Sequence, residues 1–327
     1  MKHHERLEAT LHGQDTDRPA ISLWRHWPHE DQQVDGLIRA HLTFQQAYDW
    51  DLLKFSPAGS YAVEDWGVQT AFRGSPEGTR DYLTRVIHEP ADWERLPPLP
   101  LDRGMIGIVL EALRGLSLAL GGQVPVVATI FSPLSLAQKL AGPRFLDDLR
   151  QQPALFHAGL HTIAETTARL ARASVDAGAD GVFFATQCAT RALLSEDEYA
   201  VFGEPYDLLV LEAVRGALVV VHIHGQDILF DRIARWPGVQ AINWHDRRTA
   251  PTMAEAGQRF PGALIGGLDE WGPLLHGTPA QVEAQVHQAI AQTGGRRLIV
   301  GPGCVVPPAA PPAHLAAARR AVETYRP

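Results

Sequence analysis

The sequence predicts an α/β fold of the (β/α)8 TIM barrel type. Eight short apolar runs are spaced along the 327 residues, and longer segments with apolar residues at helical spacing separate them. The runs are apolar throughout, which is typical of parallel strands that are buried on both faces. Regular alternation of such strands with helices favours a barrel, and an α/β barrel often takes this much chain as one domain. We therefore expect one barrel domain over residues 1–327.

The apolar runs predict eight strands, which are Ala20–Leu23, Leu52–Phe55, Val124–Phe131, Gly181–Ala185, Ala217–Ile223, Val239–Trp244, Ala263–Gly267 and Leu298–Val300. Helical spacing predicts a helix that opens at Pro153 and ends near Gly178, and further helices over Glu196–Arg215, Thr278–Gln292 and Pro312–Tyr325. Thr278 followed by Pro279 and Gln281 is typical of a capped helix start.

The segment Tyr61–Trp93 breaks this alternation. Two alternating stretches, Gln69–Arg73 and Asp81–Ile87, flank the turn-forming residues Gly74–Gly78. This pattern predicts a β-hairpin inserted after the second strand. A doubly wound open sheet is the competing fold, but no glycine-rich dinucleotide turn follows the first strand.

Composition excludes several classes of protein. The formal net charge is −8 and no long run of Lys and Arg occurs, which argues against nucleic acid as the main partner. The only cysteines, Cys188 and Cys304, cannot form a disulfide framework. The first residues lack the apolar core of a signal peptide, and no apolar run reaches the ~18 residues of a membrane span. We therefore expect a cytoplasmic globular protein. Exposed apolar groups on the helices of a barrel are compatible with a homodimer.

The catalytic site of a barrel lies at the C-terminal ends of its strands, and a candidate metal site occurs there. His222 and His224 lie two residues apart at the end of the fifth strand, so both imidazoles can point to one face. Cys304 follows the eighth strand and can supply a third ligand. Catalytic zinc typically has three protein ligands and one open position. The alternative is that all three side chains only pack or bind water.

Other residues at this rim are candidates for catalysis or binding. Asp269 is a candidate base or amine anchor, or only a helix cap. His245 and Asp246 are a candidate base and its orienting carboxylate, although neighbouring residues rarely pair in this way. The candidate substrate-binding residues are Arg25, Trp24, Trp244 and Lys54. Arg25 can bind a carboxylate through two hydrogen bonds, or it can form a salt bridge to Asp51 or Asp269. The tryptophans can line a pocket for a flat ligand.

Several short motifs, in their order and spacing, resemble the uroporphyrinogen decarboxylase superfamily over essentially the whole chain. They are Arg6-Leu7-Glu8-Ala9, Asp17-Arg18-Pro19, Asp180-Gly181, Ile242-Asn243-Trp244, Gly266-Gly267-Leu268-Asp269, Leu275-His276-Gly277-Thr278-Pro279, and Gly301-Pro302-Gly303-Cys304 with Pro307-Pro308 and Pro311-Pro312. The resemblance implies one (β/α)8 barrel with its cleft at the C-terminal ends of the strands.

The resemblance implies two types of reaction. One branch of the superfamily decarboxylates uroporphyrinogen without metal or cofactor, and carries Gln-Ala-Gly-Arg after the first strand, where this chain has Trp24-Arg25-His26-Trp27. Its Asn-Leu-Asp-Pro turn appears here as Gly267-Leu268-Asp269-Glu270. The other branch comprises cobamide-dependent methyltransferases that use zinc to activate a thiol such as coenzyme M. That branch carries His-x-Cys on the fifth strand and a Cys after the eighth, whereas this chain has His222, His224 and Cys304.

Three functional hypotheses follow from the sequence. The first is zinc-dependent methyl transfer to a small thiol, with Zn(II) on His222, His224 and Cys304 and a corrinoid carried on a partner protein as the donor. The second is cofactor-free decarboxylation of a tetrapyrrole, in which Arg25 binds carboxylates and Asp269 or Asp246 stabilises a protonated pyrrole. The third is a non-catalytic protein that binds a corrinoid or a tetrapyrrole. The first keeps more of the residues that its chemistry needs.

Overall fold

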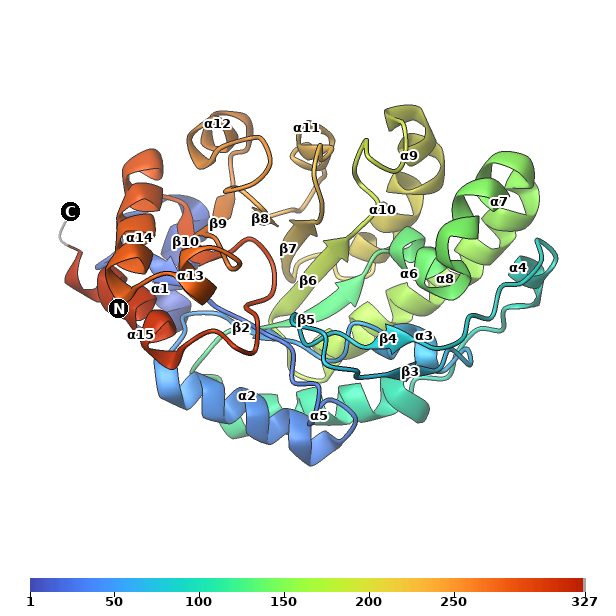
Figure 1. Cartoon of the computed structure of the whole chain (residues 1–327), viewed down its shortest axis with the longest axis horizontal. Helices are drawn as coiled ribbons and strands as arrows, with labels where there is room; N and C mark the ends of the chain where they lie inside the picture. The colour runs from blue at the N-terminus through green and yellow to red at the C-terminus, as the bar shows by residue number, and fades with distance from the viewer. Residues whose placement is uncertain (326–327) are drawn as a thin grey trace.

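The computed structural model describes residues 1–325, and its centre is a sheet of eight parallel strands (Figure 1). The strands follow one another around the sheet in the order β1-β10-β9-β8-β7-β6-β5-β2. Their bounds are β1 (Ala20–Ile21), β2 (Leu53–Phe55), β5 (Val126–Phe131), β6 (Gly181–Thr186), β7 (Leu218–Ile223), β8 (Ala241–Trp244), β9 (Ala263–Leu268) and β10 (Leu298–Pro302). Each expected strand is present, so the barrel fold is confirmed.

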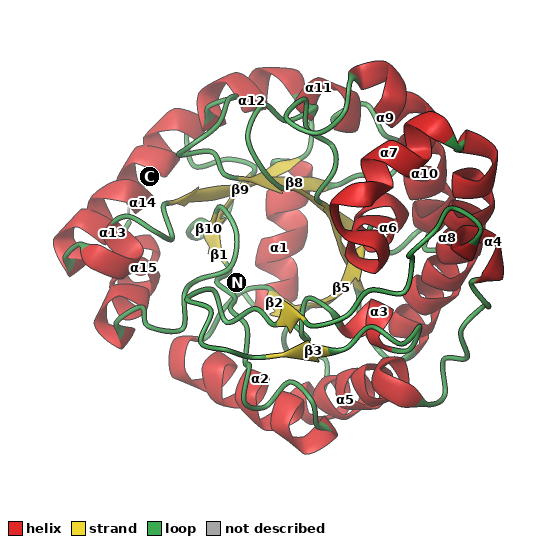
Figure 2. Ribbon diagram, turned by 45° about the vertical axis from the view of Figure 1, so that its right-hand side comes forward, coloured by secondary structure: helices red, strands yellow, loops and turns green. Residues whose placement is uncertain are grey.

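Helices surround the ring of strands (Figure 2). The longer ones are α1 (His3–His12), α2 (Val34–Tyr48), α5 (Gly104–Leu120), α8 (Pro153–Asp176), α10 (Glu204–Glu212), α14 (Pro279–Thr293) and α15 (Pro312–Thr324). The shorter ones are α3 (Tyr61–Glu64), α4 (Asp92–Arg95), α6 (Pro133–Ala141), the 3-10 turn η1 (Gly142–Arg144), α7 (Phe145–Gln151), α9 (Glu196–Phe202), α11 (Phe230–Ile233), α12 (Met253–Arg259) and α13 (Pro273–His276). Helix α1 places Leu7 among the residues of the barrel interior and covers its N-terminal end.

The expected helices are found with small differences. The predicted helix 196–215 is divided into α9 and α10 at Gly203, directly before Glu204 and Pro205. Thr278 caps α14 by accepting from the amide of Gln281, while the Gln281 side chain returns to Thr278. Gly178 has a φ of 104° in the turn after α8. That left-handed conformation favours glycine and explains the residue at this position.

The edge strands β1 and β2 are joined by the residues just before β2 rather than by a strand ladder. The amide of Asp51 donates to the carbonyl oxygen of Ile21 at 2.9 Å, and the hydroxyl of Ser22 donates to the carbonyl oxygen of Leu52 at 2.7 Å. The carboxylate of Asp51 also accepts from the amide of Ile21 at 3.0 Å. These bonds bring the two edges together and close the barrel.

Alternation along β7 determines where its side chains point. Leu218 and Val220 belong to the cluster inside the barrel, whereas Val219 and Val221 pack against the surrounding helices. His222 continues the inward series, and its neighbour across the sheet is Asn243 of β8. The strand therefore directs one imidazole into the barrel at its C-terminal end.

The predicted hairpin is present but shorter than expected. Its strands β3 (Thr70–Ala71) and β4 (Asp81–Tyr82) pair antiparallel over two residues each. Gly78, at the tip, has a φ of 75°, and a side chain there would meet Pro308 and His26 at 3.0–3.1 Å. The close approach places the hairpin, residues 70–82, against the C-terminal ends of the barrel strands.

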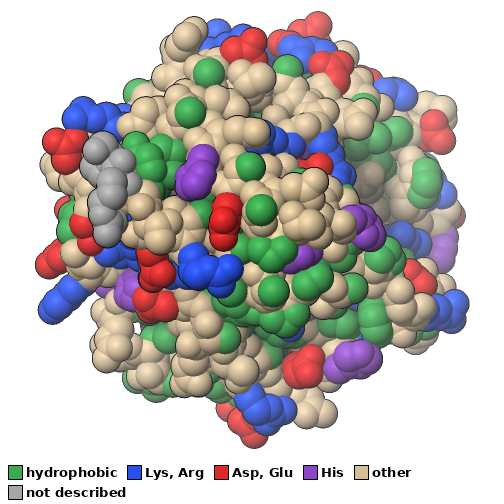
Figure 3. Space-filling view, turned by 60° about the vertical axis from the view of Figure 1, so that its left-hand side comes forward, with side chains coloured by type: hydrophobic (Ala, Val, Ile, Leu, Met, Phe, Trp, Pro, Cys, Tyr) green, Lys and Arg blue, Asp and Glu red, His purple; other side chains and the backbone are tan. Residues whose placement is uncertain are grey.

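The surface shows acidic and basic side chains side by side. On the face drawn in Figure 3, red and blue side chains are interspersed and no large patch of a single charge occurs. Among residues 1–325, no helix has the length and apolar character needed to cross a membrane.

The closure of the barrel predicts a strong dependence of stability on Asp51. Its buried carboxylate accepts from Arg6 at 2.6 Å and from Arg18 at 2.6 and 3.0 Å. Burial alone would raise the pKa of Asp51, but hydrogen bonds from His3 and Arg18 and the nearby arginine charges lower the pKa to about 2. Asp51→Asn leaves the arginines without their anion, so we expect a loss of about 3–5 kcal/mol in the free energy of unfolding, measured by urea denaturation.

The pH dependence of stability and a matched control variant also test whether Asp51 stabilises the closed barrel. Because the folded pKa is depressed, the contribution is present above the unfolded pKa of ~3.9 and is lost as pH falls toward 2. The wild type should therefore lose stability over this window more steeply than Asp51→Asn. Asp15→Asn removes an exposed pair with Arg296 and should cost less than about 1 kcal/mol. Equal effects of the two variants would show that Asp51 does not hold the barrel closed.

Candidate functional site

A cavity of about 280 Å³ lies at the C-terminal ends of the strands. Strand ends contribute Trp24, Lys54 and the residues of β5 to β7, and the hairpin covers the cavity with Glu77, Thr79, Arg80 and Tyr82. His222, His224 and Cys304 lie on its wall. The residues predicted as metal ligands are thus brought together at one place.

Asn243 fixes the protonation of His222. The side-chain amide of Asn243 donates to the carbonyl oxygens of Ile265 at 2.9 Å and Pro302 at 3.0 Å. Its Oδ1 therefore faces Nδ1 of His222, 2.6 Å away, and Nδ1 must carry the proton. The other nitrogen, Nε2, is buried and has no hydrogen-bond partner among the described residues. A free lone pair therefore remains on Nε2 of His222.

His245 is held in a similar way by Glu270. Nδ1 of His245 lies 3.1 Å from Oε1 of Glu270, and since a carboxylate only accepts, this nitrogen donates. Nε2 of His245 then faces Nδ1 of His224 at 3.3 Å. The second oxygen of Glu270 accepts from the amide of Gly303 at 3.0 Å. One carboxylate thus positions both His245 and the loop that carries Cys304.

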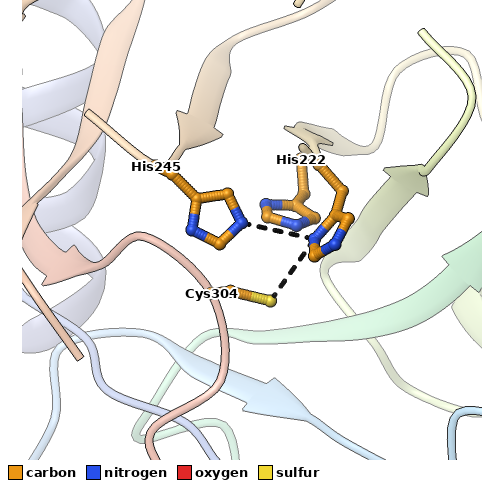
Figure 4. A group of neighbouring side chains, drawn as sticks. His222, His245 and Cys304 are labelled. Atoms are coloured by element: carbon orange, nitrogen blue, oxygen red, sulfur yellow. Dashed lines mark hydrogen bonds between the residues drawn. The ribbon is translucent and has the colours of Figure 1, made fainter. Parts of the chain in front are cut away.

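Four potential ligand atoms converge. Those of His222, His224, His245 and Cys304 all lie within 4.8 Å of one another. The sulfur of Cys304 is 3.8 Å from Nδ1 of His224, and Figure 4 shows His222, His245 and Cys304 directed toward one point. A tetrahedral zinc with bond lengths of about 2.0–2.1 Å to nitrogen and about 2.3 Å to sulfur places two nitrogens about 3.4 Å apart, and a nitrogen and a sulfur about 3.6 Å apart. The 3.8 Å between the Cys304 sulfur and Nδ1 of His224 fits this geometry. Nε2 of His245 lies 3.3 Å from Nδ1 of His224, close enough to be a further ligand.

Burial controls the charge of these groups. Loss of hydration lowers the pKa of His222 well below its usual value, and the neighbouring histidines lower it further. The same effect lowers the pKa of His224 to about 4. Loss of hydration and the charge of Glu270 raise the pKa of Cys304 to about 12. At neutral pH both imidazoles are therefore uncharged, the lone pair on Nε2 of His222 is free to bind a cation, and the thiol keeps its proton.

Two of the four predicted substrate-binding residues line the cavity. Trp24 packs edge-on against Phe183, with ring centroids 5.2 Å apart. Lys54 lies over the Phe183 ring at 4.7 Å and donates to the hydroxyl of Ser56 at 3.0 Å. Phe183 in turn stacks on His222 at 5.6 Å. An aromatic wall therefore connects the lysine with the histidine cluster.

The other two predicted substrate-binding residues, Arg25 and Trp244, lie outside the cavity. Arg25 stacks on Trp27 at 4.3 Å and reaches the carbonyl oxygen of Pro308 at 3.4 Å. It pairs with neither of its expected carboxylate partners, because Asp51 is held by Arg6 and Arg18. Trp244 is fully buried on the helix side of β8, where its indole donates to the carbonyl oxygen of Pro251.

The two aspartates predicted as catalytic do not face the cluster. Asp246 accepts from the amide of Gly267 at 2.9 Å, and burial raises its pKa to about 6. Asp269 pairs with Arg248 and accepts from the amide of Trp271 at 3.1 Å. Of the expected catalytic set, only His245 contributes an atom to the cluster.

Sequence reasoning missed Glu270, Asn243 and Lys139 as site residues. Asn243 belongs to the motif Ile242-Asn243-Trp244, one of those that resemble the superfamily. Its place beside His222 follows from the register between β7 and β8. Glu270 directly follows Asp269, the carboxylate that the sequence analysis named as a candidate. Only the turn after β9 decides which of the two side chains points inward. Lys139 lines the cavity from α6, where no strand-end rule applies.

Comparisons with known proteins agree with this architecture. A sequence model described as uroporphyrinogen decarboxylase (URO-D) matches residues 60–325. A methylcobamide:CoM methyltransferase, MtbA of Methanosarcina mazei, is 25% identical and covers 98% of both chains. A uroporphyrinogen decarboxylase of a Synechococcus species is 28% identical over 63% of this chain and 59% of its own length. These similar proteins are enzymes by name.

A solved structure shares the whole fold. A methyltransferase from Methanosarcina mazei superposes with a TM-score of 0.86 at 20% identity, covering 99% of this chain and 98% of its own. This likeness concerns the fold alone. Because the family model spans well over half of the sequence, the chain belongs to the uroporphyrinogen decarboxylase family.

Proposed function

We propose that this protein transfers a methyl group from a methylated corrinoid to a small thiol, at a zinc site held by His222, His224 and Cys304. The observation that carries the proposal is the convergence of these ligand atoms around the unpartnered Nε2 of buried His222. A buried polar atom without a partner is costly unless something binds it. The full-length likeness to methylcobamide:CoM methyltransferases supports the same reaction.

The donor set suits zinc. Two imidazole nitrogens and one cysteine sulfur match the ligand types of catalytic zinc sites, which leave one position open. A bound zinc ion supplies the positive charge that keeps a coordinated thiol deprotonated near neutral pH. Asn243 orients His222, and such outer partners are a regular feature of zinc-binding histidines.

We assign His245 as the base that takes the proton of the substrate thiol. Its Nε2 lacks a proton, because Nδ1 donates to Glu270. When Nε2 accepts the thiol proton, the imidazole becomes positively charged beside the Glu270 carboxylate, which stabilises it. The deprotonated sulfur is then the nucleophile for the methyl carbon of the donor. As the sulfur–carbon bond forms, the cobalt–carbon bond of the donor would break and the corrinoid would keep the electron pair.

A groove beside the cavity offers the methyl donor its own approach to the histidine and cysteine cluster. An open groove of about 650 Å³ adjoins the cavity and shares Tyr82, Lys139, Gln187 and His224 with it. The smaller cavity suits a small thiol, and the larger groove suits a bulky donor carried on a partner protein. His224 lies on both, where the two substrates would meet.

The tetrapyrrole hypothesis has less support. A cavity of about 280 Å³ is at the lower end of the size range of pockets for drug-sized ligands, and a uroporphyrinogen is larger than these. Arg25 does not line the cavity, and Asp269 is occupied by Arg248. The residues expected to bind carboxylates and to stabilise a pyrrole are therefore not assembled around one space.

The metal site predicts about one zinc per chain, with a specific role for Cys304. Cys304→Ser should lower zinc affinity by about 100-fold or more, because a hydroxyl is harder to deprotonate and binds zinc poorly. Cys188→Ser is the matched control, since Cys188 is buried away from the cluster. Metal analysis and calorimetric titration of zinc into metal-free protein measure both. The zinc proposal is abandoned if Cys304→Ser binds zinc as tightly as Cys188→Ser.

The assignment of His245 predicts a separation of zinc binding from activity. His245→Gln should keep its zinc but lose about 100-fold or more in methyl transfer from methylcobalamin to 2-mercaptoethanesulfonate, followed by visible absorbance. Its activity should rise with pH, since the thiol then deprotonates without a base. His222→Gln should lose the zinc itself. If His245→Gln loses zinc as completely as His222→Gln, His245 is a fourth ligand and not the base.

A further inference from the structure

Helix α5 is unusually apolar for a helix at the surface. Glu111 and Arg114 are the only charged residues among its 17 residues, and Ser117 is its only other polar side chain. A surface helix normally carries polar residues on its outward face, and a helix that is apolar all round is typical of a buried position. Leu118 is nevertheless 76% exposed, more than any other large apolar side chain among residues 1–325. This helix therefore has the character of a contact surface.

The outer face of α5 borders a groove that is separate from the candidate site. The inner face packs on the barrel through the buried side chains of Val109, Leu113 and Leu116. The groove on the other side has a volume of about 730 Å³, and α2 forms its second wall (Figure 1). The two helices approach closely at Gly115, where a side chain would meet Cδ1 of Ile38 at 2.5 Å. No residue along this groove lines the central cavity or the groove beside it.

Four residues along the groove form a pattern that is the same in both directions. Gly107, Glu111, Arg114 and Leu118 follow one another at intervals of four, three and four residues, which places them on one face of the helix. If a second copy of α5 lay antiparallel on this face, Leu118 of each copy would lie opposite Gly107 of the other. Glu111 would likewise lie opposite Arg114. A leucine then meets a residue without a side chain and each acid meets a base, so the face is complementary to itself.

The charges on this face have no partner within the chain. Glu111 and Arg114 form neither an ion pair nor a side-chain hydrogen bond among residues 1–325, although they lie three positions apart on one helix. The groove also carries Asp35 and Asp102, so its acidic side chains outnumber its one arginine. This excess of negative charge disfavours nucleic acid or another acidic partner. A second copy of the chain, in contrast, offers one base for each Glu111.

We propose that two copies of this chain associate through α5, packed antiparallel about a two-fold axis at the level between Glu111 and Arg114. Such symmetric contacts are the commonest form of soluble oligomer. Helix α2 lies beside α5 and would add Val34 to the contact. Asp35 and Asp102 of the two copies repel one another, so the dimer is weak, with a Kd on the order of 10 μM. This association goes beyond the proposed function and does not depend on it.

Sedimentation of the 327-residue chain over about 1–500 μM tests the association. The mean mass should rise from the monomer mass of 35.8 kDa toward twice that value. Leu118→Asp places a charge in the contact and should raise the Kd by about tenfold or more. Val201→Asp is the matched control, because Val201 is also an apolar helix residue and is 49% exposed on α9. A wild type that stays monomeric throughout would overturn the proposal and leave this face to a different protein.

Exchange of the two charges tests the antiparallel arrangement. Glu111→Arg or Arg114→Glu alone places like charges opposite each other in the dimer, so each should raise the Kd by about tenfold or more. The double variant Glu111→Arg/Arg114→Glu restores opposite charges at both places and should return the Kd to within about threefold of the wild-type value. A double variant as weak as the single variants would overturn the proposed arrangement.

Hydrogen exchange of the unmodified protein tests the same face without a substitution. Amides of α5 and of the first turn of α2 should exchange more slowly at ~200 μM than at ~2 μM, because the dimer covers them. Amides of α9 should exchange equally at both concentrations. Zinc content should be the same in Leu118→Asp and in the wild type, since no residue of α5 belongs to the histidine and cysteine cluster. Concentration-dependent protection at α9 or at the hairpin, and not at α5, would overturn the proposal.

Discussion

The buried carboxylate of Asp51 joins the two edges of the eight-stranded sheet, and the geometry of the cavity depends on this junction. Asp51 binds Arg6, Arg18 and the amide of Ile21, and it lies three residues before Lys54. The ion cluster at the N-terminal end of the strands therefore fixes where β2 begins, and with it the position of Lys54 on that strand. The arginine charges and the hydrogen bonds offset the desolvation cost of burying this carboxylate, and removal of the carboxylate alone would leave the arginine charges uncompensated.

A second set of polar contacts holds the other side of the cavity. Asn243 connects four strands, since it lies on β8, faces His222 of β7 and donates to carbonyl groups of β9 and β10. Glu270 then connects His245 with the loop of Cys304. Each candidate group is thus oriented by a partner that is itself fixed by the backbone, which is the arrangement that a preformed site requires.

The sequence predicts the strands well because parallel strands in a barrel are apolar on both faces, and that pattern is local. It also predicts His222 and His224, since alternation along one strand determines their direction, and Cys304, since it follows another strand. It cannot predict Glu270 over Asp269, because a turn of a few residues decides which carboxylate points inward. Arg25 is drawn away from the cavity by stacking on Trp27, and Lys139 reaches the cavity from a helix. The contact of Arg25 with Pro308 and the place of Lys139 both depend on packing between segments that are far apart in the sequence.

The hairpin and the neighbouring groove have a consequence for the order of events. The hairpin covers the small cavity, and the groove meets it at Lys139 and His224. On the proposed function, a bulky donor seated in the groove would cover the side of the cavity at Lys139 and His224, and we infer that it would hinder exchange of the small thiol there. The thiol must then enter before the donor arrives, and the methylated product must leave after the donor departs. Such an enzyme follows ordered sequential kinetics through a ternary complex, with no methylated form of the protein between two half-reactions.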